Sequence, residues 1–213
     1  MDKNLEWVIE KRIERTIKNL EKNNMEGYYV KDEKEVVEKV KEFINEGDTV
    51  AVGGSMTLFE TGVIDLLRDG KYNFLDRYKQ GLTQDDIKEI YRKSFFADAY
   101  CASSNAITEN GELYNVDGTG NRVAAMIYGP ENVILVIGYN KIVKDIEDAI
   151  RRNREIAAPA NAKRLDRKTP CKDLGYCVDC NSEARICNEY VIIRKQAIKG
   201  RIKIIIVGKE LGY

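Results

Sequence analysis

The chain contains 213 residues, of which 43% are hydrophobic and 33% are charged. This composition is that of one folded domain with a charged surface, and it excludes a disordered protein. Thirty-five basic residues balance thirty-five acidic ones, so no overall basic field would attract nucleic acid or an anionic membrane. The chain has no histidine, which excludes Ser-His and Cys-His catalysis and zinc sites built on histidine.

The sequence also predicts where in the cell the protein is found. No stretch approaches the roughly 18 consecutive apolar residues of a membrane span, and the first residues, MDKNLEWVIEKRIERTIKNLEKNN, are too charged for a secretory signal. We therefore expect a cytoplasmic protein that binds neither nucleic acid nor membrane. In a reducing compartment its five cysteines are expected as metal ligands or redox groups rather than as disulfides.

The first part of the chain is expected to be mainly helical. Apolar residues recur every three or four positions over 5–23, which predicts an amphipathic helix. A short strand is expected at 27–30, and a second helix carries the apolar residues of 36–44. We expect residues 1–46 to form a helical segment that packs on the core of an α/β domain spanning 47–213.

Strands alternate with helices through the rest of the chain. The segment 48–52 is typical of a buried strand, and a helix is expected at 57–67 after a glycine turn. Thr83 begins a helix in the capping-box form T-x-x-D, with Asp86 at the third helical position. Further strands are expected at 72–75, 97–102, 132–138, 191–193 and 202–208, and further helices at 123–127 and 141–153. This alternation predicts a Rossmann-like, mostly parallel sheet with helices on both faces.

The turn after the strand 48–52 is a candidate binding loop. Glycines let backbone N–H groups converge there, and a helix N-terminus favours an anion such as phosphate or carboxylate. The candidate ligand-binding residues are Gly53, Gly54, Ser55 and Thr57. The structural alternative is a tight strand-to-helix turn in which Ser55 or Thr57 only caps the helix.

A second glycine turn precedes the small-residue helix at 123–127. Arg122 in this turn has a guanidinium group that can hold a carboxylate or phosphate with two hydrogen bonds. The alternative is a hairpin and helix entry with Arg122 in solvent. Two such strand ends in one sheet favour a ligand crevice at its carboxyl edge. The candidate residues here are Ser104, Asn105, Gly118, Thr119, Gly120, Asn121 and Arg122.

Four of the five cysteines are clustered in a segment, 158–190, that lacks hydrophobic periodicity. The spacing C-x5-C-x2-C-x6-C contains one chelating C-x2-C pair and two flanking thiols, and it predicts a four-sulfur metal site. Sulfur-only ligation suits zinc or an iron–sulfur cluster, and four free thiols are the alternative. The predicted ligands are Cys171, Cys177, Cys180 and Cys187. Cys101 lies in an apolar strand and is expected in the core.

Basic residues precede the cysteines along the chain. They are expected either to hold an anionic ligand or partner, or to form a solvated basic face. These residues are Arg151, Arg152, Arg154, Lys163, Arg164, Arg167 and Lys168.

Three sequence blocks resemble the signature blocks of the lactate-utilisation (LUD) domain family, in particular its protein C-like members. These blocks are GGSMTLFETG, SSNAITENGELYNVDGTGNRVAA and NVILVIGYNKIV. The resemblance implies the superfold of ribose-5-phosphate isomerases and CoA-transferases, with the ligand at the strand ends. The E-N-G tripeptide is similar to the motif in which class I CoA-transferases carry a nucleophilic glutamate, which makes Glu109 a catalytic candidate. Asp117 is a candidate base if burial raises its pKa.

The family resemblance implies a small anionic metabolite as ligand and a role in a complex that oxidises lactate to pyruvate with iron–sulfur partner proteins. That context favours an iron–sulfur cluster, of the 4Fe-4S type, at the cysteines, with zinc as the alternative. No G-x-G-x-x-G follows a strand, so redox chemistry would depend on the cysteines or on a partner. The alternatives are an isomerase or acyl/CoA transferase, and a non-catalytic binding protein with a structural metal. Homo-oligomer formation, and whether the chain is an enzyme by itself, stay open.

Overall fold

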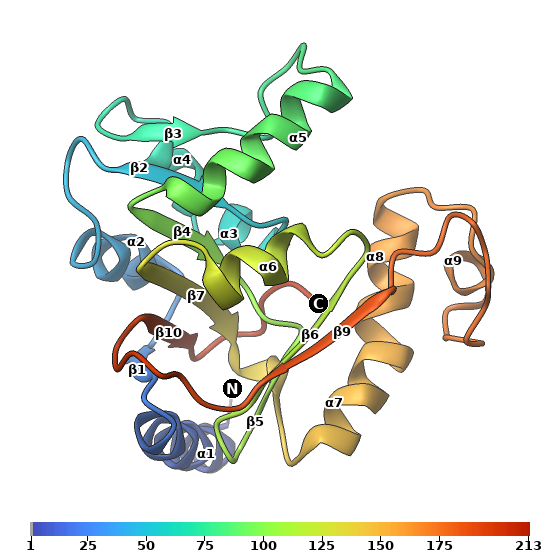
Figure 1. Ribbon diagram of the computed structural model, residues 1–213. Helices are drawn as coiled ribbons and strands as arrows, with labels where there is room; N and C mark the ends of the chain where they lie inside the picture. Colours follow the sequence, from blue (N-terminus) through green and yellow to red (C-terminus); the bar gives the residue numbers. More distant parts are fainter. Residues whose placement is uncertain (1) are drawn as a thin grey trace.

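A computed structural model describes residues 2–213 and shows an α/β fold built on a six-stranded sheet in which every pair is parallel (Figure 1). The expected fold class is confirmed. The strand order is β1-β10-β7-β4-β2-β3. The bounds are β1 Glu26–Val30, β2 Thr49–Val52, β3 Asn73–Leu75, β4 Ala99–Ala102, β7 Asn132–Gly138 and β10 Ile202–Val207.

Side chains of the central strands alternate between two hydrophobic cores. On β7, Val133, Leu135 and Ile137 face one core and Ile134 and Val136 face the other, as the two-residue period of a strand requires. The first core is covered by α1 (Lys3–Lys22) and α6 (Asn121–Tyr128), and the second by α2 (Lys34–Lys41), α3 (Met56–Glu60) and α4 (Val63–Leu67). Helices on both faces explain why these strands are apolar throughout.

Residues 1–46 contribute more than helices. β1 pairs in parallel with β10, with Glu26 opposite Lys203, so this segment supplies the edge strand of the main sheet. Ile13 and Leu20 of α1 lie in the first core with 1% and 0% exposure. The expected division between 46 and 47 therefore falls within one continuous sheet.

Two helices replace the single one expected at 57–67. Gly62 lies in the left-handed region with φ 73° and separates α3 from α4, because an L residue with a side chain adopts that backbone only at a cost. The capping box before α5 (Gln84–Lys93) is confirmed. The Thr83 N–H donates to Asp86 Oδ2 over 2.8 Å, and the Asp86 N–H donates to Thr83 Oγ1 over 3.2 Å.

A second sheet lies beside the first, which the sequence did not predict. Its order is β8-β5-β6-β9, with β6 antiparallel to both neighbours. The strand expected at 191–193 is present as β9 of this second sheet, and its Ile193 packs in the first core. The bounds are β5 Ala106–Thr108, β6 Leu113–Asp117, β8 Ile142–Val143 and β9 Glu189–Ile193.

Helix continues further toward the cysteines than expected. After α7 (Ile146–Arg152) a π-helical turn at Asn153–Ala157 leads into α8 (Ala158–Arg164). Pro159 has no N–H to donate to the preceding turn, which accounts for the interruption. Irregular chain occupies 165–188, apart from the short helix α9 (Pro170–Leu174), and lies at one side of the molecule in Figure 1. Within residues 2–213, no helix has the length and apolar character to cross a bilayer.

The β5–β6 turn packs directly on the backbone of α1, which yields a stability prediction. Gly111 has φ +78°, and a Cβ there would lie 2.7 Å from backbone atoms of Asn19 and Leu20. We expect Gly111→Ala to lower the free energy of unfolding by about 3 kcal/mol, because strain and a backbone clash add together. Gly70, with φ +89° and no atom within 4 Å, is the control, and Gly70→Ala should cost only about 1 kcal/mol. Equal losses in urea denaturation would contradict the clash.

Candidate functional site

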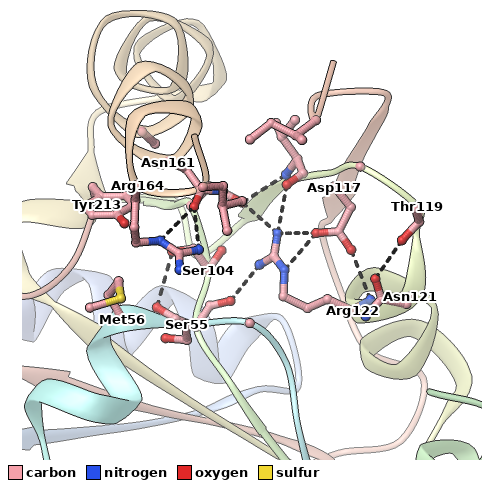
Figure 2. A pocket seen from close by; sticks show the side chains of 18 of the residues that line it. Ser55, Met56, Ser104, Asp117, Thr119, Asn121, Arg122, Asn161, Arg164 and Tyr213 are labelled. Atoms are coloured by element: carbon pink, nitrogen blue, oxygen red, sulfur yellow. Dashed lines mark hydrogen bonds and ion pairs between the residues drawn. The ribbon is translucent and has the colours of Figure 1, made fainter. Parts of the chain in front are cut away.

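A cavity of about 430 Å³ opens at the carboxyl ends of β2, β4 and β7. Loops after these strands form its floor, and α8 together with Arg185 and Ile186 forms its opposite wall. Figure 2 shows side chains from α6 and α8, among them Arg122 and Arg164, entering the same space. The predicted crevice at the carboxyl edge of the sheet is therefore present.

The cavity is strongly basic although the whole chain is neutral. Asp117 is its one acidic lining residue. The basic lining residues are Arg77, Arg122, Lys141, Arg164, Arg167 and Arg185. Such an excess of positive charge in a concave site attracts and retains an anion.

Arg122 is occupied by contacts within the chain. Its Nε donates to Asp117 Oδ1 over 2.8 Å, and its two Nη atoms donate to four oxygens at 2.7 to 3.0 Å. Those oxygens belong to Ser103, Asn115, Asn105 and Val116. A guanidinium group has five N–H donors, so none is left for the bidentate ligand contact expected from the sequence. Arg122 lines the cavity and holds its walls together.

Asp117 fills the anion position at the start of α6. Its Oδ2 accepts the backbone N–H groups of Arg122 and Val123 over 3.0 and 3.1 Å, and its Oδ1 is 2.7 Å from Arg122 Nη2. The helix N-terminus that the sequence offered to a ligand is thus satisfied by an internal carboxylate. With both oxygens engaged, Asp117 is arranged to hold the loop rather than to accept a proton.

Two loop glycines allow close packing around this ion pair. A Cβ on Gly53 would lie 2.9 Å from Arg122 Cγ, and a Cβ on Gly118 would lie 3.3 Å from the Ile186 backbone. Gly118 lines the cavity, whereas Gly53 and Gly120 lie outside the lining. Gly120 has φ 70° and precedes α6.

The first predicted loop is divided between capping and lining. Ser55 caps α3, because its Oγ accepts the Leu58 N–H over 3.3 Å. This is the capping role that was the alternative to ligand binding in the sequence analysis. Gly54 and Ser55 also line the cavity, and a Cβ on Gly54 would lie 3.6 Å from Arg77. Thr57 is buried outside the lining.

The polar residues of the second loop have similar double roles. The Ser104 hydroxyl donates to the carbonyl of Ala106 over 2.9 Å, and Asn105 Oδ1 accepts from Arg122 over 2.8 Å. Thr119 donates to Asn121 Oδ1 over 2.9 Å. All four of these loop residues line the cavity (Figure 2).

Lys141 is the main residue that the sequence analysis missed. It follows β7, is 2% exposed, and its Nζ donates to Thr57 Oγ1 over 3.1 Å and to Ser103 Oγ over 3.0 Å. No carboxylate lies within ion-pair distance of Lys141 among the described residues. The signal in the sequence that could have identified Lys141 is its place just after β7, the most apolar strand.

Burial governs the chemistry of Lys141. Loss of solvation, with the positive charges of Arg152 and Arg122 nearby, lowers its pKa to about 7. Arg152 is itself buried, which lowers its pKa to about 10, and it donates to the Asn140 and Asn105 carbonyls. Near neutral pH, Lys141 can exist as an amine or as a cation, and an anion beside it would favour the cation.

Three further basic lining residues have contacts that leave N–H donors available. Arg77 lies over the rings of Tyr78 and Tyr91, at 5.4 and 4.7 Å. Arg164 donates to Asn161 Oδ1, and the Arg167 Nε donates to the Ala184 carbonyl. Of the basic run expected before the cysteines, Arg164 and Arg167 thus reach the cavity, whereas Arg151 is 61% exposed and pairs with Asp148.

Glu109 lies away from the cavity. It is located in the β5–β6 turn, where its carboxylate pairs with Arg12 over 2.8 Å and with Arg15 over 3.2 Å. It is not a lining residue, so the structure does not bring this catalytic candidate together with the others.

The four clustered cysteines line a second, small cavity of about 10 Å³. Within residues 2–213, no group of three or more His, Cys, Asp or Glu residues is close enough to hold one metal ion. Cys101 is fully buried in β4, as expected, and burial raises its pKa to about 12, which makes it an unreactive thiol.

The chain is an α/β protein with a basic cavity at the carboxyl edge of a parallel sheet. The sequence model of the LUD domain matches residues 13–207. The chain belongs to the LUD domain family, which confirms the family expected from the sequence.

One solved structure shows the same fold at low identity, and others are less similar. A DUF162 family protein from Deinococcus radiodurans is 14% identical, with 95% of this chain and 98% of that chain covered and a TM-score of 0.51. The tetrameric eIF2B-β2-δ2 complex from C. thermophilum is 19% identical over 85% of this chain and 55% of that chain, with a TM-score of 0.44. The malonate decarboxylase alpha subunit from Acinetobacter baumannii is 12% identical over 95% of this chain and 38% of that chain, with a TM-score of 0.39. No curated protein matches the chain.

The contacts of Arg122 predict a large structural effect of its removal. Arg122→Ala leaves the buried Asp117 carboxylate without its cation and several oxygens without their guanidinium donors, so we expect a loss of about 3–5 kcal/mol in free energy of unfolding. Arg122→Lys should recover little, because an ammonium group cannot reproduce the planar fork. Arg151→Ala, at an exposed i,i+3 pair, is the control and should cost under about 0.5 kcal/mol. If Arg122→Ala left the free energy of unfolding nearly unchanged, the hydrogen-bond network of Arg122 would not contribute to stability.

Lys141 predicts a defined pH dependence of stability. Below pH 7 the lysine is protonated in both the folded and the unfolded protein, so the cost of burying its charge is constant. Between about pH 7 and 10.5 only the unfolded chain holds the proton, so wild-type stability gains with rising pH. We expect Lys141→Met to be more stable than wild type by about 2 kcal/mol at pH 6, with the difference declining toward pH 10. A difference that does not vary with pH in denaturation series would refute the lowered pKa.

Proposed function

We propose that the basic cavity binds a small metabolite that carries more than one negative charge, such as a phosphate ester or a dicarboxylate. The observation that supports this most directly is Lys141, which is buried at the cavity with no carboxylate of residues 2–213 within ion-pair distance, while Glu60 acts on it only from further away. The protonated form of Lys141, which is present near neutral pH, needs a counter-charge, and a bound anion supplies one.

The arrangement of the other charges supports a ligand with several negative charges. The cation of Arg122 is already balanced by Asp117, whereas Arg77, Arg164 and Arg167 make no ion pair with a carboxylate of residues 2–213. Together with Lys141 they present more positive charge than one carboxylate would neutralise. The cavity volume of about 430 Å³ is within the range of small-molecule sites.

A second candidate is the lactate-utilisation role that the family name indicates. Here the ligand is lactate or pyruvate, and the chain is a subunit of a multi-protein complex. Oxidation of lactate to pyruvate breaks the O–H and C2–H bonds and releases two electrons and two protons. Iron–sulfur partner proteins would accept the two electrons, and Lys141, with its pKa of about 7, can take the hydroxyl proton as a base. The proton from C2 would be released to solvent.

The isomerase or acyl/CoA transferase alternative receives less support. Its expected nucleophile, Glu109, is held by two arginines outside the cavity. The other carboxylate candidate, Asp117, has both oxygens engaged in hydrogen bonds.

The ligand class can be tested by calorimetric titration with inorganic phosphate, a three-carbon sugar phosphate, pyruvate and L-lactate. We expect the phosphates to bind at least about tenfold more tightly than lactate, because they neutralise more of the charge in the cavity. Stronger binding of lactate or pyruvate would support the lactate-utilisation candidate instead. Binding of none of the four would overturn the proposal.

Matched variants separate the cavity from the general surface charge. Arg164→Gln should weaken phosphate binding by about tenfold or more, since hydrogen bonds to charged groups are worth about 1.5–3 kcal/mol. Lys163→Gln removes a charge from the adjacent exposed position of α8 and should change affinity less than about twofold. Equal effects of the two substitutions would indicate only long-range attraction.

A proton should accompany anion binding at Lys141. In the protein without ligand, Lys141 has a pKa of about 7. A bound anion raises this pKa, so Lys141 takes up a proton on binding between about pH 7 and 9. We expect proton uptake at pH 8, measured as a dependence of the binding enthalpy on the ionisation heat of the buffer. Lys141→Met should abolish this uptake, and uptake that persists in the variant would assign it to another group.

A further inference from the structure

The small cavity of the four cysteines and the basic cavity share a wall. Arg185 and Ile186 line both. The Arg185 Nε donates to the Cys187 carbonyl over 2.9 Å, and its Nη1 donates to the Cys180 carbonyl over 2.5 Å. A change in the position of these cysteines therefore acts directly on a side chain of the basic cavity.

The chain just after this wall is attached to the glycine loop of the basic cavity. The Asn188 N–H donates to the Asp117 carbonyl over 2.8 Å, and its Nδ2 donates to the Gly118 carbonyl over 2.9 Å. The Ile186 backbone lies against Gly118 so closely that a Cβ on that glycine would be 3.3 Å away. Residues 185–188 thus connect the thiols to the Asp117–Arg122 loop.

The segment 165–188 has little hydrophobic core to order it. Thr169 is its one buried residue, while Leu174, Tyr176 and Val178 are 50%, 54% and 44% exposed. The fold nevertheless directs its four thiols to one cavity. A segment that lacks a core and converges on thiols is typical of chains whose order comes from bound metal.

The chemistry of the cavity favours a thiophilic centre. Its potential metal ligands are four sulfurs, with no carboxylate, and Cys177 Sγ accepts the Asp179 N–H over 3.3 Å, a contact that stabilises a thiolate. Among residues 2–213, no three of these thiols form a group that could hold a single ion. An iron–sulfur cluster binds its thiolates through different iron atoms, whereas a single zinc ion would have to draw the sulfurs together.

We propose that Cys171, Cys177, Cys180 and Cys187 hold one thiolate-ligated metal centre, and that filling this centre tightens anion binding in the basic cavity. The second half of this proposal rests on the proposed function. Metal binding orders residues 185–188, so the anion no longer has to order that wall when it binds. Such coupling is reciprocal, and the anion must tighten metal binding by the same factor.

The thiol site is tested on the full chain, purified without oxygen and loaded in one arm with ferrous iron and sulfide and in the other with zinc. We expect one centre per chain in one of the two arms, read as metal and sulfide content and visible absorption. Each of Cys171→Ser, Cys177→Ser, Cys180→Ser and Cys187→Ser should lose at least half of the metal, and proteolysis within 165–188 should become faster. Cys101→Ala, in the core, should retain full content.

Three results would overturn the thiol site. The first is full metal content in the four serine variants, and the second is metal loss confined to Cys101→Ala. The third is a protein that takes up neither iron nor zinc and forms a disulfide between two of the four cysteines.

The coupling is tested separately with inorganic phosphate. We expect phosphate to bind at least about fivefold more tightly to the loaded wild-type protein than to the stripped protein, and the Cys177→Ser variant should show no such gain. Equal affinity in both states would overturn the coupling. If phosphate binds neither state while metal content is complete, the thiol site is supported and the proposed function fails, so the two failures are distinguishable.

Discussion

The buried ion pair of Asp117 and Arg122 is the contact on which the site depends. One guanidinium group joins the end of β6, the loop after β4 and the start of α6 through five hydrogen-bond donors. A buried charge is tolerated only when it is paired and hydrogen-bonded throughout, and this pair meets both conditions. That requirement determines how the end of β6, the loop after β4 and the start of α6 meet.

The ion pair also explains why the net charge of the cavity is positive. Asp117 neutralises Arg122 and occupies the helix N-terminus, so the internal network carries no net charge of its own. The remaining basic groups come from elements distant in sequence, with Arg77 following β3, Lys141 following β7 and Arg164 ending α8. Their charges are unbalanced within the cavity, and this imbalance is the feature that an anionic ligand would relieve.

The segment 165–188 links a second chemistry to the same site. It supplies Arg167, Arg185 and Ile186 to the basic cavity and all four clustered cysteines to the small one. Because the segment packs on the Gly118 turn through Ile186 and Asn188, its order and the shape of the basic cavity are not independent. This gives a physical reason for the attachment of the cysteine-rich segment to the loops of the basic cavity.

Local sequence patterns determined the elements, the parallel sheet and the carboxyl-edge location of the site, because strand and helix periods, caps and glycine turns act over a few residues. They also identified Ser55, Ser104, Thr119 and Asn121, which line the basic cavity. Only the tertiary structure decided that Arg122 and Asp117 satisfy one another, that Glu109 pairs with α1, and that Lys141 is buried without a carboxylate. Those outcomes depend on which distant groups share a buried space, since pairing and loss of solvation are properties of that space rather than of any stretch of chain.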